Sequence, residues 1–203
     1  DKPLQKWENG TGTPDIANLM AIADLFQISV DELLSNEKSE KKQSNYIYES
    51  RTEYDIDGKK NFDIKLGGAY AVDLKAYHGE KIEVAMFSNV YKNLLADYKV
   101  KIDDIKNRID IDLNRFNEAS EADAKESLVI TIFIPVKYIG KIELSVNAGT
   151  LNITDIENEH IEVNGKISEV TLQGNKSEIE MDSNLDMQIS VLSHEGALEI
   201  NQL

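Results

Sequence analysis

Apolar residues between Pro14 and Leu34 recur at the spacing of an α-helix. Counting from Ile16, they stand three, four, seven and ten positions further on, at Leu19, Met20, Ala23 and Phe26. Thr13 is suited to cap the first helix, and Pro14 is tolerated at its first position. Ser29-Val30-Asp31-Glu32 has the form of a capping box for a second, short helix. The pattern therefore predicts two short helices in this stretch.

After Asn45 the apolar period changes to two, which predicts β-strands with one buried face. The alternation is seen in Phe62/Ile64/Leu66, Val72/Leu74, Ile82/Val84/Met86 and Ile109/Ile111/Leu113. Residues 128–134 are apolar almost throughout, as expected of a strand covered on both faces. Asp57-Gly58 predicts a hairpin turn between two runs. The polar residues 117–126 are expected as an exposed loop with room for one helical turn.

From Ile142 onward, short apolar–polar–apolar strands recur. Ile142-Glu143-Leu144, Ile161-Glu162-Val163, Ile179-Glu180-Met181 and Leu198-Glu199-Ile200 start 19, 18 and 19 residues apart. Between them lie Leu151-Asn152-Ile153, Val170-Thr171-Leu172 and Ile189-Ser190-Val191, each 19 residues apart. Two such strands per repeat predict a stacked β-solenoid or rolled β-sheet. An antiparallel meander is the alternative that the spacing leaves open.

Residues 36–45 contain no apolar side chain and are expected to be a solvated linker. They divide the chain into an all-α segment, residues 1–35, and a β-rich domain, residues 46–203, with repeats from about residue 141. The predicted fold class is therefore mainly β, with a repetitive β-solenoid or rolled β-sheet domain after a small helical segment.

The charge balance narrows the classes of partner. The chain holds 22 Lys and Arg against 37 Asp and Glu, a net charge of −15, so it does not coat nucleic acid as a whole. Residues 141–203 hold 3 Lys against 12 Asp and Glu, a net charge of −9. That part is expected to meet a protein partner, another copy of itself or a cationic ligand. The absence of cysteine excludes disulfides, Cys-ligated metals and a thiol nucleophile.

The N-terminal segment resembles the xenobiotic-response-element (Cro/cI-like) helix-turn-helix family of bacterial and phage regulators. The resemblance is carried by Trp7-Glu8-Asn9-Gly10, Thr13-Pro14-Asp15-Ile16 and Ser29-Val30-Asp31-Glu32-Leu33-Leu34. It implies a partial DNA-binding domain of five helices, of which this chain begins at the third, the recognition helix. A regulator of this kind is expected to work as a homodimer in the cytoplasm, because a single helix-turn-helix reads one half-site. Without the first two helices, the chain is expected to bind DNA weakly or not at all.

The same resemblance implies which residues contact DNA. Positions that face base edges in the family correspond to Asp1, Lys2, Gln5 and Lys6, and positions that contact phosphate correspond to Asn9 and Thr11. Lys can donate to guanine O6 and N7, and Asp can accept from cytosine N4. The alternative is that the lysines and the glutamine are ordinary exposed residues of a helix fragment.

Residues 46–203 resemble, less specifically, a bacterial adhesin-like domain of unknown function. The resemblance rests on Ile132-Phe133-Ile134-Pro135, on residues 142–149 and on the short strands that follow. It implies the alternative to a regulator, an adhesin-like surface or structural binding protein with no DNA role.

No pattern for catalysis stands out. The three histidines, His78, His160 and His194, lack the spacing of metal ligands, and no glycine-rich phosphate loop or nucleophile motif is present. Tyr46, Tyr48 and Tyr54 could line a sugar- or peptide-binding surface or pack across strands. We expect a non-enzymatic protein with no cofactor, no metal and no membrane partner. The expected function is that of a bacterial transcriptional regulator whose β domain oligomerises, senses a ligand or docks a partner.

Overall fold

The computed structural model describes residue 16 and residues 18–20, 46–117, 119–183 and 186–202. The chain divides into two compact units, residues 1–42 and residues 43–203. In the first unit, residues 16 and 18–20 are helical, as the apolar spacing predicts. The second of the predicted helices and the predicted linker lie outside the described residues. The second unit, called the β unit below, holds all the described strands.

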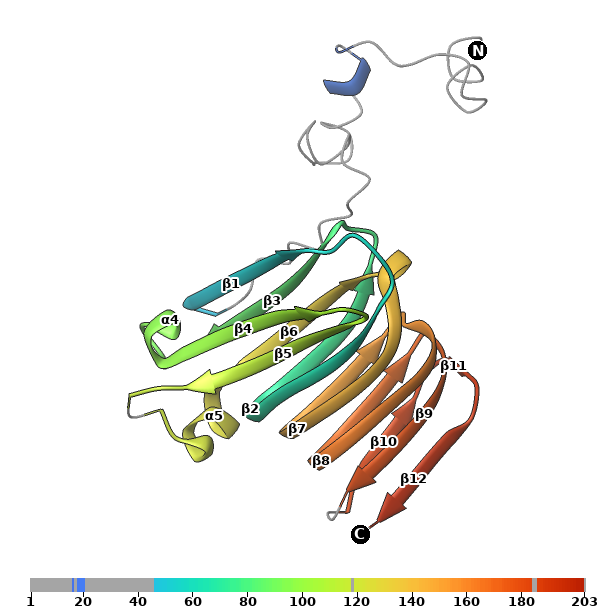
Figure 1. The fold of residues 1–203 in the computed structure, drawn as a ribbon. Helices are drawn as coiled ribbons and strands as arrows, with labels where there is room; N and C mark the ends of the chain where they lie inside the picture. The colour runs from blue at the N-terminus through green and yellow to red at the C-terminus, as the bar shows by residue number, and fades with distance from the viewer. Residues whose placement is uncertain (1–15, 17, 21–45, 118, 184–185, 203) are drawn as a thin grey trace. The chain divides into compact units, whose positions relative to one another are not determined.

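The β unit winds in coils that stack in parallel on one another (Figure 1). Three long strands lie side by side in chain order, β2 (Lys60–Tyr77), β7 (Ile139–Thr154) and β8 (Glu157–Gln173). The first half of β8 pairs with β9 (Asn175–Ser183), whereas its second half pairs with β10 (Gln188–Val191). Each long strand thus serves two faces of the stack, called face one (first halves) and face two (second halves).

The final coil is formed by shorter strands. β11 (His194–Glu195) and β12 (Leu198–Gln202) both pair in parallel with β9, and β12 is the outermost strand of face one. β10 is the outermost strand of face two at the same end of the stack.

The observed register places the sequence repeats on top of one another. Ile142 lies opposite Ile161, Ile161 opposite Ile179, and Ile179 opposite Leu198, all in parallel pairs. On face two, Val170 lies opposite both Leu151 and Ile189. The solenoid prediction is therefore confirmed, and the antiparallel meander is wrong for the repeat region, because every ladder there is parallel.

The first half of the β unit adds one more coil, on the opposite side of β2 from β7. β5 (Arg108–Arg115) and β6 (Val129–Pro135) pair in parallel with the first and second halves of β2. Antiparallel strands then close this end of the stack. β4 (Tyr98–Ile105) pairs with β5, β3 (Lys81–Ser88) pairs with β6, and β1 (Tyr48–Asp55) pairs with β3.

The hairpin predicted at Asp57-Gly58 is wrong. The segment does connect β1 to β2, but β1 pairs with β3, whereas β2 pairs with β5, β6 and β7. A turn dipeptide fixes the local chain reversal but not the pairing. Here the apolar side of β2 is buried in the stack, and β1 serves as an outer strand.

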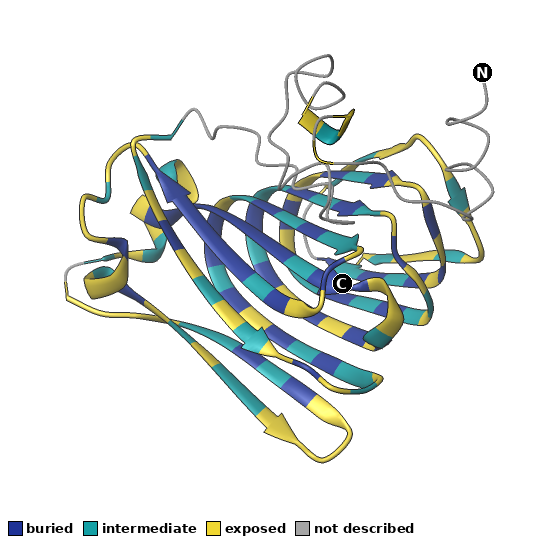
Figure 2. Cartoon of the chain, turned by 90° about the horizontal axis from the view of Figure 1, so that it is seen from above, coloured by how far each residue is buried: buried dark blue, intermediate teal, exposed yellow. Residues whose placement is uncertain are grey.

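The core lies between the faces, and Figure 2 shows buried and exposed positions alternating along the stacked strands. Ile64, Leu144, Val163 and Met181 stand one above another in the ladder and are buried. Each large aliphatic side chain buried in this way contributes roughly 1.5–3 kcal/mol. A coil cannot bury its inward residues alone, so the neighbouring coils stabilise one another.

Two short α-helices, α4 (Leu94–Asp97) and α5 (Glu121–Ser127), and one 3-10 helix, η1 (Val136–Tyr138), lie in the connections of the described β unit. The Ser120 hydroxyl accepts a hydrogen bond from the Asp123 amide at 3.1 Å and so caps α5. Ala124 faces the core and is buried. Glu121 accepts a hydrogen bond from Asn147 Nδ2 at 2.9 Å, which ties α5 to β7. The loop predicted for residues 117–126 is thus largely a helix, whereas the covered strand predicted for residues 128–134 is confirmed as β6.

Candidate functional site

The expected DNA-contacting residues Asp1, Lys2, Gln5, Lys6, Asn9 and Thr11 lie outside the described residues. The candidate sites that can be built from the structure therefore belong to the β unit. Two features stand out, a hollow where the coils turn and a continuous row of carboxylates on face one.

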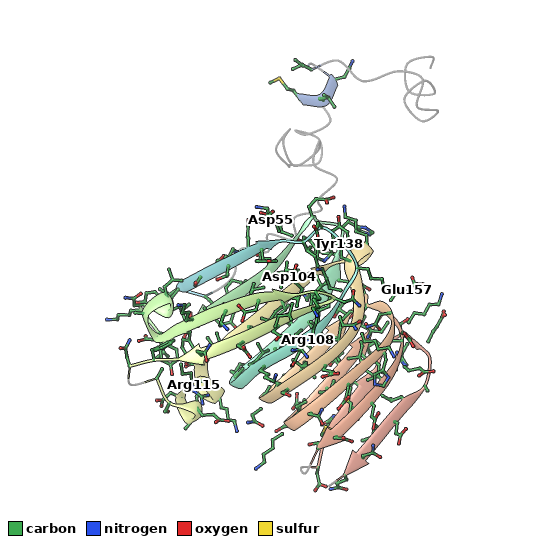
Figure 3. The ribbon with its side chains drawn as sticks, in the orientation of Figure 1. Asp55, Asp104, Arg108, Arg115, Tyr138 and Glu157 are labelled. Atoms are coloured by element: carbon green, nitrogen blue, oxygen red, sulfur yellow. The ribbon has the colours of Figure 1, made fainter. Side chains whose placement is uncertain are left out.

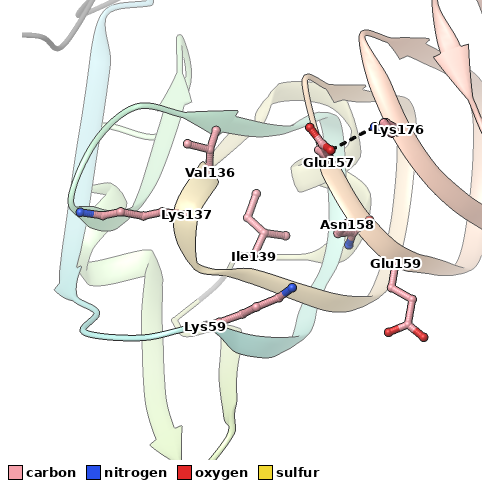
Figure 4. Close-up of a pocket in the computed structure, with 8 residues that line it drawn as sticks. All are labelled: Lys59, Val136, Lys137, Ile139, Glu157, Asn158, Glu159 and Lys176. Carbon is pink, nitrogen blue, oxygen red and sulfur yellow. Dashed lines mark ion pairs between the residues drawn. The ribbon is translucent and has the colours of Figure 1, made fainter.

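The hollow, of about 380 Å³, lies where β7, β8 and β9 begin. Figure 4 shows Val136 and Ile139 between Lys59 and Lys137 on one side and the ion pair of Glu157 with Lys176 on the other. The residues that line it come from four separate segments: Lys59, Val136, Lys137, Ile139, Glu157, Asn158, Glu159 and Lys176.

Four of the five charged side chains that line the hollow, all except Lys59, form ion pairs or hydrogen bonds with one another or with near neighbours in the described part of the chain. Lys176 Nζ lies 3.3 Å from Glu157 Oε1, and Lys141 Nζ lies 3.2 Å from Glu159 Oε1. Lys137 donates to Glu80, and this hydrogen bond raises the pKa of Lys137. These contacts offset much of the charge that the hollow could offer to a ligand.

The side chain of Asn158, on the wall of the hollow, forms hydrogen bonds within the protein. Its Nδ2 donates to the backbone oxygens of Gly140 at 2.8 Å and His160 at 3.0 Å. Its Oδ1 accepts from Ser177 Oγ at 2.6 Å. At the equivalent corner of the preceding coil, Asn61 Oδ1 accepts a hydrogen bond from the Lys141 amide at 2.9 Å. Asparagine side chains at this corner therefore join successive coils by hydrogen bonds. The lining residues include no histidine, hydroxyl or thiol.

The outward side of face one carries seven carboxylates in one row. Each lies opposite the next across a strand pair, roughly 4.8 Å apart in the direction of the stack. The row, called the acidic ladder below, runs from the first end of the stack to the last: Asp103, Asp110, Asp63, Glu143, Glu162, Glu180 and Glu199.

Basic side chains offset the ladder at its first end. Lys101 pairs with Asp103, Arg108 Nε lies 2.6 Å from Asp110 Oδ1, and Lys65 Nζ lies 2.8 Å from Asp63 Oδ2. The hydrogen bond to its carboxylate raises the pKa of each of these cations. Figure 3 shows Arg108 on β5 beside this part of the stack.

Further along, amides rather than cations meet the carboxylates. Asn164 Nδ2 donates to Glu162 Oε1 at 2.7 Å, and Asn201 Nδ2 donates to Glu180 Oε1 at 3.3 Å. An amide offsets no charge, so this half of the ladder keeps a negative surface that repels phosphate. The repeat spacing contained the signal for Glu143, Glu162, Glu180 and Glu199. Nothing in the spacing placed Asp63 or Asp110 beside them.

Glu162→Gln is expected to raise the free energy of unfolding by about 0.2–1 kcal/mol at neutral pH and low salt, because Glu162 lies between Glu143 and Glu180. Urea unfolding at low and high NaCl measures the gain, which salt should reduce. Glu169→Gln on the same strand is the matched control, because its ladder neighbours are Thr150 and Gln188. Equal gains in both variants would show that repulsion along the ladder is unimportant.

The tyrosines near the start of the β unit are used for packing. The Tyr46 ring lies 5.8 Å from that of Phe87, and Tyr48 and Tyr54 pack against the main core. Of the two roles that the sequence left open, packing across strands is the one observed.

Neither a metal group nor a membrane-spanning helix is found among the described residues. No three or more His, Asp or Glu side chains of the described part gather where they could hold a metal ion. None of its helices has the length and apolar character needed to cross a membrane.

Comparison with known proteins adds a family match at the N-terminus. Residues 4–33 match the helix-turn-helix family, which confirms the resemblance drawn from the sequence for that segment. No curated protein matches the chain.

Among solved structures, the chain is similar to a "putative cell adhesion protein" from Clostridium sporogenes ATCC 15579, with 10% identity and a TM-score of 0.47, over 77% of this chain and 99% of that one. It is also similar to a "putative adhesin" from Bacteroides fragilis NCTC 9343, with 12% identity and a TM-score of 0.30, over 77% and 98% of the two chains. A protein of the same description from Parabacteroides merdae ATCC 43184 gives 10% identity and a TM-score of 0.29, over 76% and 96%. These names agree with the adhesin-like resemblance of residues 46–203, but likeness at this level assigns no activity to this chain.

Proposed function

We propose that this chain belongs to a bacterial DNA-binding transcriptional regulator. The observation that carries the proposal is the match of residues 4–33 to the helix-turn-helix family. In this proposal residues 1–35 read DNA in the cytoplasm, residues 36–45 are a linker, and residues 46–203 oligomerise, sense a ligand or dock a partner.

The proposed contacts are those that the family resemblance implies. Asp1, Lys2, Gln5 and Lys6 face base edges in the major groove, and Asn9 and Thr11 contact phosphates. A lysine at a base edge donates to guanine, so Lys6 carries sequence preference as well as charge.

The chemistry of the β unit supports this division of roles. The acidic ladder extends along face one, and within the described part of the chain its first three members are the ones that pair with cations. A row of carboxylates at strand spacing repels the DNA backbone, whose affinity for proteins depends on cationic contacts. The β unit therefore contributes through a ligand, a protein partner or copies of itself rather than through DNA, and a homodimer supplies the second half-site reader.

Lys6→Ala is expected to weaken binding to the specific duplex by about 5- to 150-fold, equivalent to roughly 1–3 kcal/mol, and to relax the preference at one base pair per half-site. The protein as its gene encodes it, with any residues before Asp1, is titrated with a labelled duplex from its own promoter region. Fluorescence anisotropy follows binding, and affinity should fall steeply with salt because phosphate contacts release counterions. The chain beginning at Asp1 should bind the same duplex weakly or not at all.

Lys166→Ala is the matched control, since it removes the same charge from an exposed position of the β unit. It should leave affinity unchanged. If Lys6→Ala and Lys166→Ala behave alike, Lys6 reads no base. If the gene-encoded protein binds no duplex, the β unit carries the function, as in an adhesin-like binding protein.

A further inference from the structure

The two ends of the coil stack differ in how their edges are covered. At the first end, the edge strands β1 and β4 are antiparallel caps with charged residues at about half of their positions. At the second end, β10 and β12 pair on one side only among the described residues, with β8 and β9 (Figure 1). Native proteins protect free sheet edges with charges, bulges or covering segments. β10 has no charged side chain and β12 has only Glu199.

The core also ends uncovered at the second end. Ile189, Val191, Leu198 and Ile200 lie opposite buried residues of the preceding coil, so they face inward. Yet Val191 is 49% exposed and Ile200 is 47% exposed. Their counterparts one coil back, Leu172 and Met181, are almost fully buried. The second end thus presents two unpaired strand edges around an open section of the hydrophobic core.

We propose that a second copy of this chain covers this end, with β12 pairing antiparallel to β12 about a two-fold axis. Rotation by 180° about an axis perpendicular to the sheets returns face one to face one and face two to face two. The β12 edges can therefore pair in a closed, isologous dimer, with the β10 edges facing each other on the other sheet. The inward residues of the two copies meet, and one core continues through both.

Charge selects this arrangement over a parallel one. Within the chain, parallel stacking sets Glu180 opposite Glu199, and another acidic coil in the same register would lengthen the acidic ladder. Antiparallel pairing centred on Ile200 sets Glu199 opposite Asn201 of the second copy. That contact repeats one already present, in which Asn201 Nδ2 donates to Glu180 Oε1.

The pattern of facing residues then fixes the register. Residues that lie opposite each other in a strand pair share a face, so the register can change only in steps of two residues if Ile200 is to stay inward. Each such step moves the centre of the two-fold pair by one residue. Moving the centre by one residue, to Glu199, would set the two Glu199 carboxylates directly opposite each other, which is unfavourable. The register centred on Ile200 avoids this and brings the two Ile200 side chains together.

Sedimentation velocity of the full chain tests the dimer. The chain should sediment as a dimer, and its dissociation constant should fall as NaCl rises, since each copy carries a net charge of −15. Ile200→Lys should raise that constant at least about 30-fold, since it places a charge in the centre of the contact. Ile105→Lys is the matched control, because Ile105 lies on the edge strand β4 and is also 47% exposed.

A single introduced cysteine tests the register, since the chain has none of its own. Directly opposite residues of an antiparallel pair have Cα atoms roughly 4.5–5.5 Å apart, within reach of a disulfide. Under mild oxidation Ile200→Cys should become a covalent dimer and Glu199→Cys should remain largely uncrosslinked. A chain that stays monomeric at about 0.1 mM, forms open polymers or responds equally to both lysine variants would overturn the proposal. It rests on the β unit alone, so its failure would be distinct from a failure to bind DNA.

Discussion

Gly165→Ala is expected to lower the free energy of unfolding by about 3–5 kcal/mol, through backbone strain and overpacking together. Gly165 has φ of +140°, a conformation that side chains rarely adopt, at the bend where β8 passes from face one to face two. A Cβ at this position would lie 1.8 Å from the backbone oxygen of Val146, its partner on β7. Neither backbone can move without breaking the ladder between two coils.

Gly58→Ala is the control for the general effect of replacing glycine. No atom lies within 4 Å of a Cβ built there, so the change should be small, and it can stabilise slightly by restricting the unfolded chain. Urea unfolding of both variants gives the comparison. Equal stabilities would mean that β7 and β8 do not approach as closely as the structure shows.

Ile161→Ala is expected to cost about 2–5 kcal/mol, because it opens a cavity between stacked coils. Ile161 is fully buried and lies between Ile142 and Ile179 in the ladder. Ile161→Val should cost roughly 0.5–1.5 kcal/mol, in proportion to the smaller cavity.

Ile105→Ala removes the same atoms from an exposed position on β4 and should change stability by less than about 0.5 kcal/mol. Denaturant midpoints at constant slope measure all three variants. Similar losses for Ile161→Ala and Ile105→Ala would mean that the repeats do not face a common core.

The sequence predicted the repeat half of the β unit in detail because one spacing determines both strand position and neighbour. Residues 18 or 19 apart occupy equivalent places in successive coils, so Ile142, Ile161 and Ile179 had to stack once the fold was a solenoid. The same rule placed Glu143, Glu162 and Glu180 in one row on the outer surface.

The first half of the β unit could not be predicted in the same way. Phe62 lies opposite both Ile109 and Ile142, at separations of 47 and 80 residues that no repeat connects. Local patterns such as Phe62/Ile64/Leu66 identify a strand but not its neighbours, because many strands here have similar apolar faces. The hollow at Lys59 and Lys137 escaped prediction for the same reason, since its walls come from segments far apart in the chain.

In the proposed function the N-terminal segment, rather than the β unit, brings this protein to DNA. To test this role, sheared genomic DNA is captured with the gene-encoded protein and, in parallel, with the double variant Lys2→Ala/Lys6→Ala. The captured DNA is then sequenced. We expect a small set of enriched sites with two related half-sites, and loss of that enrichment in the double variant. Equal enrichment by both proteins, or no enriched site with the unaltered protein, would contradict it.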